Sequence, residues 1–225
     1  MFAAEPAVEI LLEAIKKIGQ EQVRGVARLV KLVEPHNYPI PRAVALIFQA
    51  VPGSNPTNVI GTLSLTENNG MVTISGSVNG LPPGPHAIHV HEFGDLSNGC
   101  LATGAHYNPF RSDHGSQENP PSARHVGDLG NIVTPVRFLN FVQHRFCAII
   151  DVLQITFKPS GPTPINIEDS LITFTGRRGI VGRAFVIHER VDDLGRGGDA
   201  GSRTVGNAGA RLACGVIGYV APGTA

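Results

Sequence analysis

The amino-acid sequence predicts an all-β domain made of short antiparallel strands, arranged as a sandwich or a barrel. Its 225 residues include 27 glycines and 17 prolines, while charged residues make up only 16% of the chain. This composition is typical of short strands joined by many turns and long ordered loops. Strand-like stretches separated by clusters rich in Gly, Pro and Asn predict the first strands at 42–50, 59–66, 71–78 and 86–92. Later strands are expected at 165–175, 180–188 and 211–220.

In the N-terminal segment, apolar residues repeat with the period of a helix and not of a strand. Between residues 7 and 33, apolar side chains recur at three- and four-residue steps, which is typical of an amphipathic helix. We therefore expect residues 1–40 to be a helical extension and 41–225 to be the β domain. The helix can pack on its own domain, join copies of the chain or act as a targeting element, and an artefact of the gene model is a further alternative. A membrane-surface role is disfavoured because acidic and basic residues are mixed.

Residues 136–158 are an atypical insertion. Of these 23 residues 14 are apolar, neither Gly nor Pro occurs among them, and Pro135 and Pro159 flank them. The segment is either a genuine insertion or a translated intron. The intron hypothesis is open because 23 whole codons preserve the reading frame. An exposed apolar stretch promotes association or hinders folding. Pro162 and Pro164 predict that the strand that follows lies at a sheet edge or contains a bulge.

Charge and targeting signals exclude several classes of protein. Lys plus Arg and Asp plus Glu both number 18, so no overall field favours nucleic acid or a membrane surface. No apolar run is long enough to cross a bilayer. The N-terminus carries Glu5, Glu9 and Glu13 without the continuous apolar run of a secretory signal. These features predict a soluble cytoplasmic protein, and its three cysteines allow at most one disulfide.

Histidines are concentrated in one part of the chain. Seven of the nine lie between residues 86 and 144. His89 and His91 are two residues apart, so in a strand both imidazoles lie on one face, although such a pair also occurs by chance. The polar segment 94–131 is long for a loop, which indicates a binding function. The further ligand-type residues are His106, His114, His125, Asp128 and His188. Three imidazoles and a carboxylate suit zinc, and an all-imidazole site suits copper.

Several segments together resemble the copper/zinc superoxide dismutase family. They are HVHEFGD (89–95), GAHYNP (104–109), RHVGDLGN (124–131), HERVDDLG (188–195) and GNAGARLACGVIG (206–218). The resemblance covers roughly 42–135 and 159–220. It implies an eight-stranded antiparallel Greek-key β-barrel, a sandwich of immunoglobulin-like type, with long metal-binding loops. The insertion then replaces a short turn at the end of the barrel away from the metals.

The resemblance also implies the site residues. Copper would be held by His89, His91, His106 and His188, and zinc by His106, His114, His125 and Asp128. His106 would bridge the two ions, and Asp192 would be the carboxylate that links a copper histidine to a zinc histidine. Cys100 and Cys214 would form a disulfide, an exception in the reduced cytosol. Arg211 would bind the anionic substrate, and His86 is either a residue beside the copper or a packed, hydrogen-bonded histidine.

The implied activity is the dismutation of superoxide to oxygen and hydrogen peroxide by a redox-cycling copper with a structural zinc. The implied partners are a second copy of the chain and a copper chaperone that delivers the metal. The matching dimer contacts are Phe93-Gly94, Ile180-Val181 and 216–218. The 196–205 loop departs from the family because it has few acidic residues and has Val205 where a Thr is usual, while Arg196 and Arg203 supply its basic charge. We therefore expect altered electrostatic steering.

Two other functions remain possible. The first is a copper chaperone with a dismutase-like domain. Such proteins carry a Met-x-Cys-x-x-Cys front domain and a Cys-x-Cys tail, and this sequence has neither but keeps His188 and Arg211. The second is an inactive isoform in which the insertion at 136–158 prevents correct folding.

Overall fold

The computed structural model describes residues 41–146, 150–159 and 161–221. The helix expected within 1–40 and the cysteine at position 147 lie outside these residues. Among the described residues, no helix is long and apolar enough to cross a membrane.

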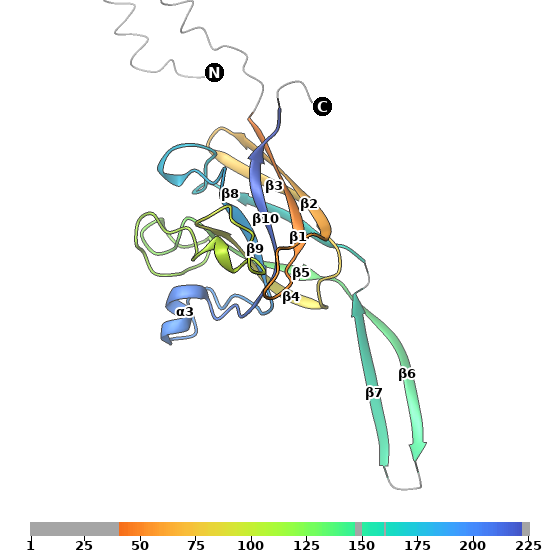
Figure 1. Cartoon of the computed structure of the whole chain (residues 1–225). Helices are drawn as coiled ribbons and strands as arrows, with labels where there is room; N and C mark the ends of the chain where they lie inside the picture. The colour runs from red at the N-terminus through yellow and green to blue at the C-terminus, as the bar shows by residue number, and fades with distance from the viewer. Residues whose placement is uncertain (1–40, 147–149, 160, 222–225) are drawn as a thin grey trace, which may run out of the picture. The chain divides into compact units, whose positions relative to one another are not determined.

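Eight strands form one antiparallel sheet that curls into a nearly closed barrel, as Figure 1 shows. The order of strands in the sheet is β5-β4-β9-β10-β1-β2-β3-β8. The predicted all-β, Greek-key barrel is confirmed. The strands are β1 (Arg42–Gln49), β2 (Val59–Asn68), β3 (Met71–Val78), β4 (Gly84–His91), β5 (Asp128–Thr134), β8 (Thr163–Asp169), β9 (Ala184–His188) and β10 (Arg211–Tyr219).

Alternating burial along the strands builds the core. In β1, Ala43, Ala45 and Ile47 are buried while the residues between them are partly or fully exposed. Phe185 of β9 is among the largest fully buried side chains, and burying a side chain of this kind contributes roughly 1.5–3 kcal/mol. β9 is buried along its whole length, and its Val186 packs against Cys100 and Cys214 in a second, smaller cluster. The barrel is therefore a rigid support for residues at the ends of β4 and β9.

The barrel closes where the insertion enters and leaves it. β5 and β8 are the two ends of the strand order, and the hydroxyls of Thr134 and Thr163 lie 2.7 Å apart in a buried hydrogen bond. Between these strands, β6 (Val136–Phe146) and β7 (Ile150–Pro159) pair as a separate two-stranded sheet with a bulge. The predicted edge position of the strand after Pro162 is confirmed, since β8 ends the strand order.

Three strand boundaries differ from the prediction. β5 lies partly inside the stretch expected to be a loop, because Gly130 and Asn131 interrupt its apolar alternation. The strand predicted at 165–175 ends at Asp169. There the carboxylate of Asp169 accepts hydrogen bonds from the backbone N–H groups of Leu171 and Ile172, and the chain turns away from the sheet. The strand predicted from residue 180 begins at Ala184.

Short helices occupy the loops around the site. They are the 3-10 helices η1 (Leu101–Thr103) and η2 (Gly176–Arg178) and the α-helix α3 (Ala200–Val205). Asp199 caps α3 by accepting the backbone N–H of Ser202 at 2.8 Å, an arrangement worth about 1 kcal/mol. The loop that carries α3 reaches the histidine-rich loop, because the backbone N–H of His114 donates to the carbonyl of Arg203 at 2.8 Å.

Candidate metal centre

Four buried histidines converge at the end of β4 and β9. His89 and His91 come from β4, His188 is the last residue of β9, and His106 lies in the following loop, bridged to His91 through the backbone. Their exposed fractions are between 0% and 4%. One ring nitrogen from each of the four lies within 4.8 Å of the others. The structure therefore brings together all four residues that the sequence predicts as one ligand set.

Hydrogen bonds decide which ring nitrogen of each histidine is free. The Nδ1 atoms of His91 and His188 face the carbonyls of Gly104 and Gly209 at 2.9 and 3.2 Å. Their Nε2 atoms lie 3.3 Å apart. These two histidines therefore direct Nε2 toward the centre of the cluster.

His89 and His106 complete the cluster with nitrogens that lack a hydrogen bond. His89 uses Nε2 to contact Asp192 at 2.9 Å, and its buried Nδ1 has no hydrogen-bond partner among the described residues. The same holds for Nε2 of His106. A buried polar atom left without a partner costs roughly 1–3 kcal/mol, and a metal ion at the centre would satisfy both. The set fits copper, which favours imidazole ligands.

A second ligand group surrounds one oxygen of Asp128. Its Oδ1 lies 2.9 Å from Nδ1 of His114 and 3.1 Å from Nδ1 of both His106 and His125. Ligands around a tetrahedral zinc at 2.0–2.1 Å are about 3.3 Å apart. The short His114 contact lacks hydrogen-bond alignment, since its Nδ1 has no hydrogen-bond partner among the described residues. Close polar atoms without such alignment are the arrangement expected of ligands to one ion.

His89 also lies within 4.8 Å of the Asp128 group, but its hydrogen bond assigns it elsewhere. Its Nε2 is engaged by Asp192, and Nδ1 belongs to the four-histidine cluster. His125 therefore fits the Asp128 group better, because its Nδ1 faces the same carboxylate oxygen. The other oxygen of Asp128 accepts the backbone N–H groups of Gly115 and His125 at 3.0 and 2.8 Å, which fixes the carboxylate.

Asp192 connects the two groups. Its carboxylate contacts Nε2 of His89 at 2.9 Å and Nε2 of His114 at 2.7 Å, and the residue is 2% exposed. Asn131 of β5 holds the main chain of Asp192 on both sides, with its amide oxygen 2.7 Å from the backbone N and its amide nitrogen 3.0 Å from the carbonyl. The resemblance implied that Asp192 links two histidines in this way, but no role for Asn131 was predicted from the sequence.

Arg124 is a second supporting residue that the sequence did not reveal. Its guanidinium donates to the backbone carbonyl of Asp128 at 2.9 Å and to the carboxylate of Asp169 at 2.6 Å. Both side chains are buried. The pair ties the Asp128 group to the end of β8. Its place directly before His125 was the one signal in the sequence. That signal could not name its partner Asp169, which is 45 residues away.

The two groups differ in protonation. Burial, followed by the charge of His106, lowers the pKa of His188 to about 4, and burial lowers the pKa of His89 and His91 as well. These rings are therefore neutral at pH 7 and can act as ligands. For His114 burial also lowers the pKa, but the nearby carboxylates of Asp128 and Asp192 outweigh it and raise the pKa to about 9. A cation in that group replaces this proton.

Arg211 lies at the start of β10 beside the histidines. Its guanidinium donates to the carbonyls of Cys100 and Gly104 at 2.6 Å each and to the hydroxyl of Thr103 at 2.7 Å. Cys100 is joined to Cys214 by a disulfide with a Cα–Cα distance of 6.0 Å. The half-buried cation is therefore held by the loop that the disulfide ties to the last strand.

Three other residues fall outside the ligand groups. His86 is buried, with its ring nitrogens 2.9 Å from the carbonyl of His188 and 2.8 Å from that of Pro82, so it is a packed, hydrogen-bonded histidine. Val205 ends α3 and is 41% exposed. Arg196 is exposed and pairs with Glu118 at 3.6 Å.

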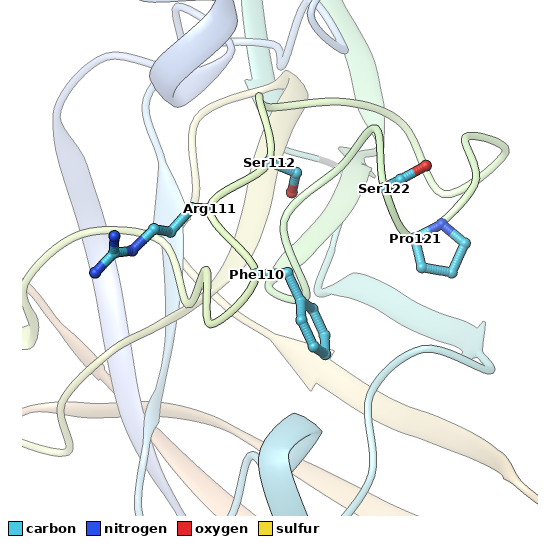
Figure 2. A pocket seen from close by; sticks show the side chains of 5 residues that line it. All are labelled: Phe110, Arg111, Ser112, Pro121 and Ser122. Carbon is cyan, nitrogen blue, oxygen red and sulfur yellow. The ribbon is translucent and has the colours of Figure 1, made fainter.

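A separate open pocket of about 380 Å³ lies on the same long loop. Figure 2 shows its lining residues, Phe110, Arg111, Ser112, Pro121 and Ser122. The side chain of Arg111 points away from the other four in this view. None of the five belongs to the ligand groups, so this pocket does not compete with the histidine cluster as a reaction site.

Comparison with known proteins identifies the family. The family model described as copper/zinc superoxide dismutase (SODC) matches residues 59–146 and 149–217. An extracellular superoxide dismutase [Cu-Zn] of Haemonchus contortus is 49% identical over 179 residues, covering 80% of this chain and 84% of the relative. The corresponding Caenorhabditis elegans protein is 45% identical, covering 80% and 70%. A solved structure, the clock protein EA4, matches with a TM-score of 0.61 and 38% identity, covering 82% of this chain and 99% of that one.

The chain therefore belongs to the copper/zinc superoxide dismutase family. Members of this family are oxidoreductases that use copper and zinc, and the chain has ligand groups that can hold both ions. Recognition of the family from the sequence motifs is confirmed.

The expectation of a cytoplasmic protein is wrong. Both nematode relatives are named extracellular enzymes. Charge balance and a few acidic residues near the N-terminus, on which the expectation rested, do not determine the compartment of a folded domain. The Cys100–Cys214 disulfide agrees with the correction, because such bonds persist in oxidising environments and are rare in the cytosol.

Proposed function

We propose that this chain is a secreted enzyme that converts two superoxide anions and two protons into oxygen and hydrogen peroxide. The observation that carries the proposal is the position of His106 between two ligand groups. Its Nδ1 lies 3.1 Å from Asp128, while its buried Nε2, which has no hydrogen-bond partner among the described residues, belongs to the four-histidine cluster. One imidazole can therefore serve two ions at once.

We assign the ligand atoms from the hydrogen bonds that leave them free. Copper would be held by Nδ1 of His89 and by Nε2 of His91, His106 and His188. Zinc would be held by Nδ1 of His106, His114 and His125 and by Oδ1 of Asp128. When bound, copper supplies one-electron redox chemistry and zinc supplies a redox-silent positive charge.

The remaining steps depend on the chain's own groups. Nε2 of His106 has no hydrogen-bond partner in the described part of the chain, so it could hold a proton whenever it does not bind copper, and pass that proton to the peroxide product. The Arg211 cation lies beside the cluster, where it attracts and orients a small anion. Asp192 keeps His89 and His114 in fixed orientations, and fixed orientation of ligand imidazoles strengthens metal binding.

We further propose a homodimer and delivery of copper by a chaperone. An apolar surface supports the dimer: Phe93 is 56% exposed and Val216 is 36% exposed. Gly94 packs against the same surface, because a Cβ there would meet Val216 at 3.2 Å. Ile180 and Ile217, which the sequence suggested as dimer contacts, are fully buried in the barrel core, so their side chains cannot contribute.

Metal analysis combined with a superoxide-consumption assay tests the proposed function. We expect one copper and one zinc per chain and cyanide-sensitive activity. His91→Ala should lose copper but retain zinc, and His125→Ala should lose zinc first. His144→Ala, which changes a histidine of β6 that is not among the proposed ligands, is the control. A soluble full-length chain that binds neither metal would contradict the proposal and favour the inactive isoform. Reversible transfer of copper without superoxide consumption would favour a copper chaperone.

A further inference from the structure

Gly206 occupies a position that leaves no room for a side chain. A Cβ atom there would lie 2.0 Å from Oδ1 of Asp192 and 2.5 Å from Nε2 of His114. Real Cβ atoms essentially never approach other atoms closer than 3.0 Å. The backbone also has φ +61°, in the left-handed region that favours glycine. Gly206 therefore lies directly against the carboxylate that connects the two ligand groups.

The carboxylate cannot move away from such an atom. The amide of Asn131 holds the backbone N–H and the carbonyl of Asp192, at 2.7 and 3.0 Å. The backbone N–H of Leu194 donates to the same Oδ1 at 2.7 Å. Any shift of the carboxylate away from residue 206 would break contacts to His89, His114 or Leu194.

The backbone of Gly206 is also fixed. Its N–H donates to the carbonyl of Ser202 at 3.2 Å, which ends α3, and its carbonyl accepts the N–H of Asp193 at 2.9 Å. Residue 206 is therefore held by hydrogen bonds on both sides. A side chain could be accommodated only by displacing Asp192 or by tilting the ring of His114.

We propose that Gly206 is a positioning residue. Its missing side chain provides the space in which one carboxylate holds His89 and His114 together, so that the geometry of the copper ligands depends on the zinc ligands. This inference rests on the proposed ligand roles of these two histidines. Gly206 itself contacts neither ion nor substrate.

Gly206→Ala tests the inference, with Gly198→Ala as the matched control. Gly198 lies in the same loop with φ +80°, and a Cβ added there would meet nothing within 4 Å. Alanine at this position therefore imposes the same kind of backbone strain without any overlap. The full-length variants are compared by zinc affinity, in competition with a chromophoric chelator, and by the visible absorption of bound Cu(II).

Gly206→Ala should weaken zinc binding by about 10- to 100-fold, the range typical of lost outer-shell partners, and shift the Cu(II) absorption band. Gly198→Ala should change neither measurably. In an Asp192→Ala background most of the effect of Gly206→Ala should disappear, because the overlapping carboxylate oxygen is gone and the ring of His114, no longer held by Asp192, can turn away from residue 206. Equal zinc affinity and equal spectra in the two glycine variants would overturn the inference.

Two further outcomes are distinguishable from that result. If wild-type protein binds neither metal, the proposed function fails and the inference fails with it, because it rests on the ligand roles of His89 and His114. If Gly206→Ala does not fold, the Asp192→Ala/Gly206→Ala double variant decides, since removal of the carboxylate should restore folding to the level of Asp192→Ala alone. Failure of the double variant to fold would overturn the role assigned to Gly206, because the overlap with Asp192 would not be the cause.

Discussion

Removal of the disulfide should cost a large part of the stability of the domain. The Cys100–Cys214 bridge closes a loop of 114 residues. In the chain-entropy treatment, cross-linking such a loop removes about 16 cal/mol/K from the unfolded chain, or about 5 kcal/mol at 25 °C. Natural domains are stable by only about 5–15 kcal/mol. We therefore expect Cys100→Ala/Cys214→Ala to lower the free energy of unfolding by up to about 5 kcal/mol.

The bridge should also affect the reaction. The carbonyl of Cys100 accepts a hydrogen bond from Arg211 at 2.6 Å. Without the bridge the loop that carries Cys100 can move, and Arg211 then loses a hydrogen bond that holds it. The variant should lose activity even at temperatures at which it remains folded. In wild type, reduction by a mild thiol should reproduce both effects.

Urea unfolding of the metal-free protein measures the change, because metal release is then not coupled to unfolding. Cys147→Ser is the control, since it removes the third cysteine without changing the bridge. A difference below about 1 kcal/mol between the double variant and wild type, with unchanged m-values, would refute the reasoning: the loop would then be constrained by its packing alone.

Four further results are expected. Arg124→Met should lower the free energy of unfolding by about 3–5 kcal/mol, because it leaves the buried Asp169 carboxylate unpaired; a loss under about 1 kcal/mol in urea titration would contradict this. Arg211→Ala should reduce the second-order rate constant for superoxide about tenfold at low salt and flatten its ionic-strength dependence, whereas Arg196→Ala, in an exposed ion pair, should change it little. Deletion of residues 136–158 should leave metal content and activity intact, since the Thr134–Thr163 hydrogen bond closes the barrel without them; a metal-free deletion variant would disprove that. Metal-free protein should lose stability as pH falls from about 6.5 to about 4, because the unfolded chain protonates His188 before the folded one, whose pKa is about 4. It should also lose stability as pH rises from about 6.5 to about 9, because folded His114, with its pKa at about 9, keeps a proton that the unfolded chain releases; a flat profile in both windows of thermal unfolding would refute the assignment.

The convergence of the four histidines could be predicted because each lies in a short motif that resembles the family. His89 and His91 alternate along a strand, and His106 and His188 stand in segments whose order matches the family. The alternation of apolar and polar residues in β1–β4 could also be predicted. β5 could not be predicted, because Asp128, Gly130 and Asn131 interrupt the apolar residues on its buried face.

The supporting contacts could not be predicted from local sequence. Asn131 holds Asp192 from 61 residues away, and Arg124 reaches Asp169 over 45 residues. No periodicity or spacing rule relates such pairs, since the barrel topology alone brings them together. The need for glycine at position 206 is of the same kind, because it depends on which atoms the folded loop places around that Cα.

The course of β5 separates the β6–β7 hairpin from the Asp128 group. Asp128 is the first residue of this strand and Thr134 is the last. At a rise of about 3.3 Å per residue, an extended strand of this length separates its ends by about 20 Å. Asp128, the proposed zinc ligand, and the residue that leads into β6 are therefore at opposite ends of β5. Pairing with β4 along its length and the buried Thr134–Thr163 hydrogen bond hold the strand in place between them. A disturbance from residues 136–158 would therefore reach Asp128 along this strand only if the pairing of β5 with β4 opened.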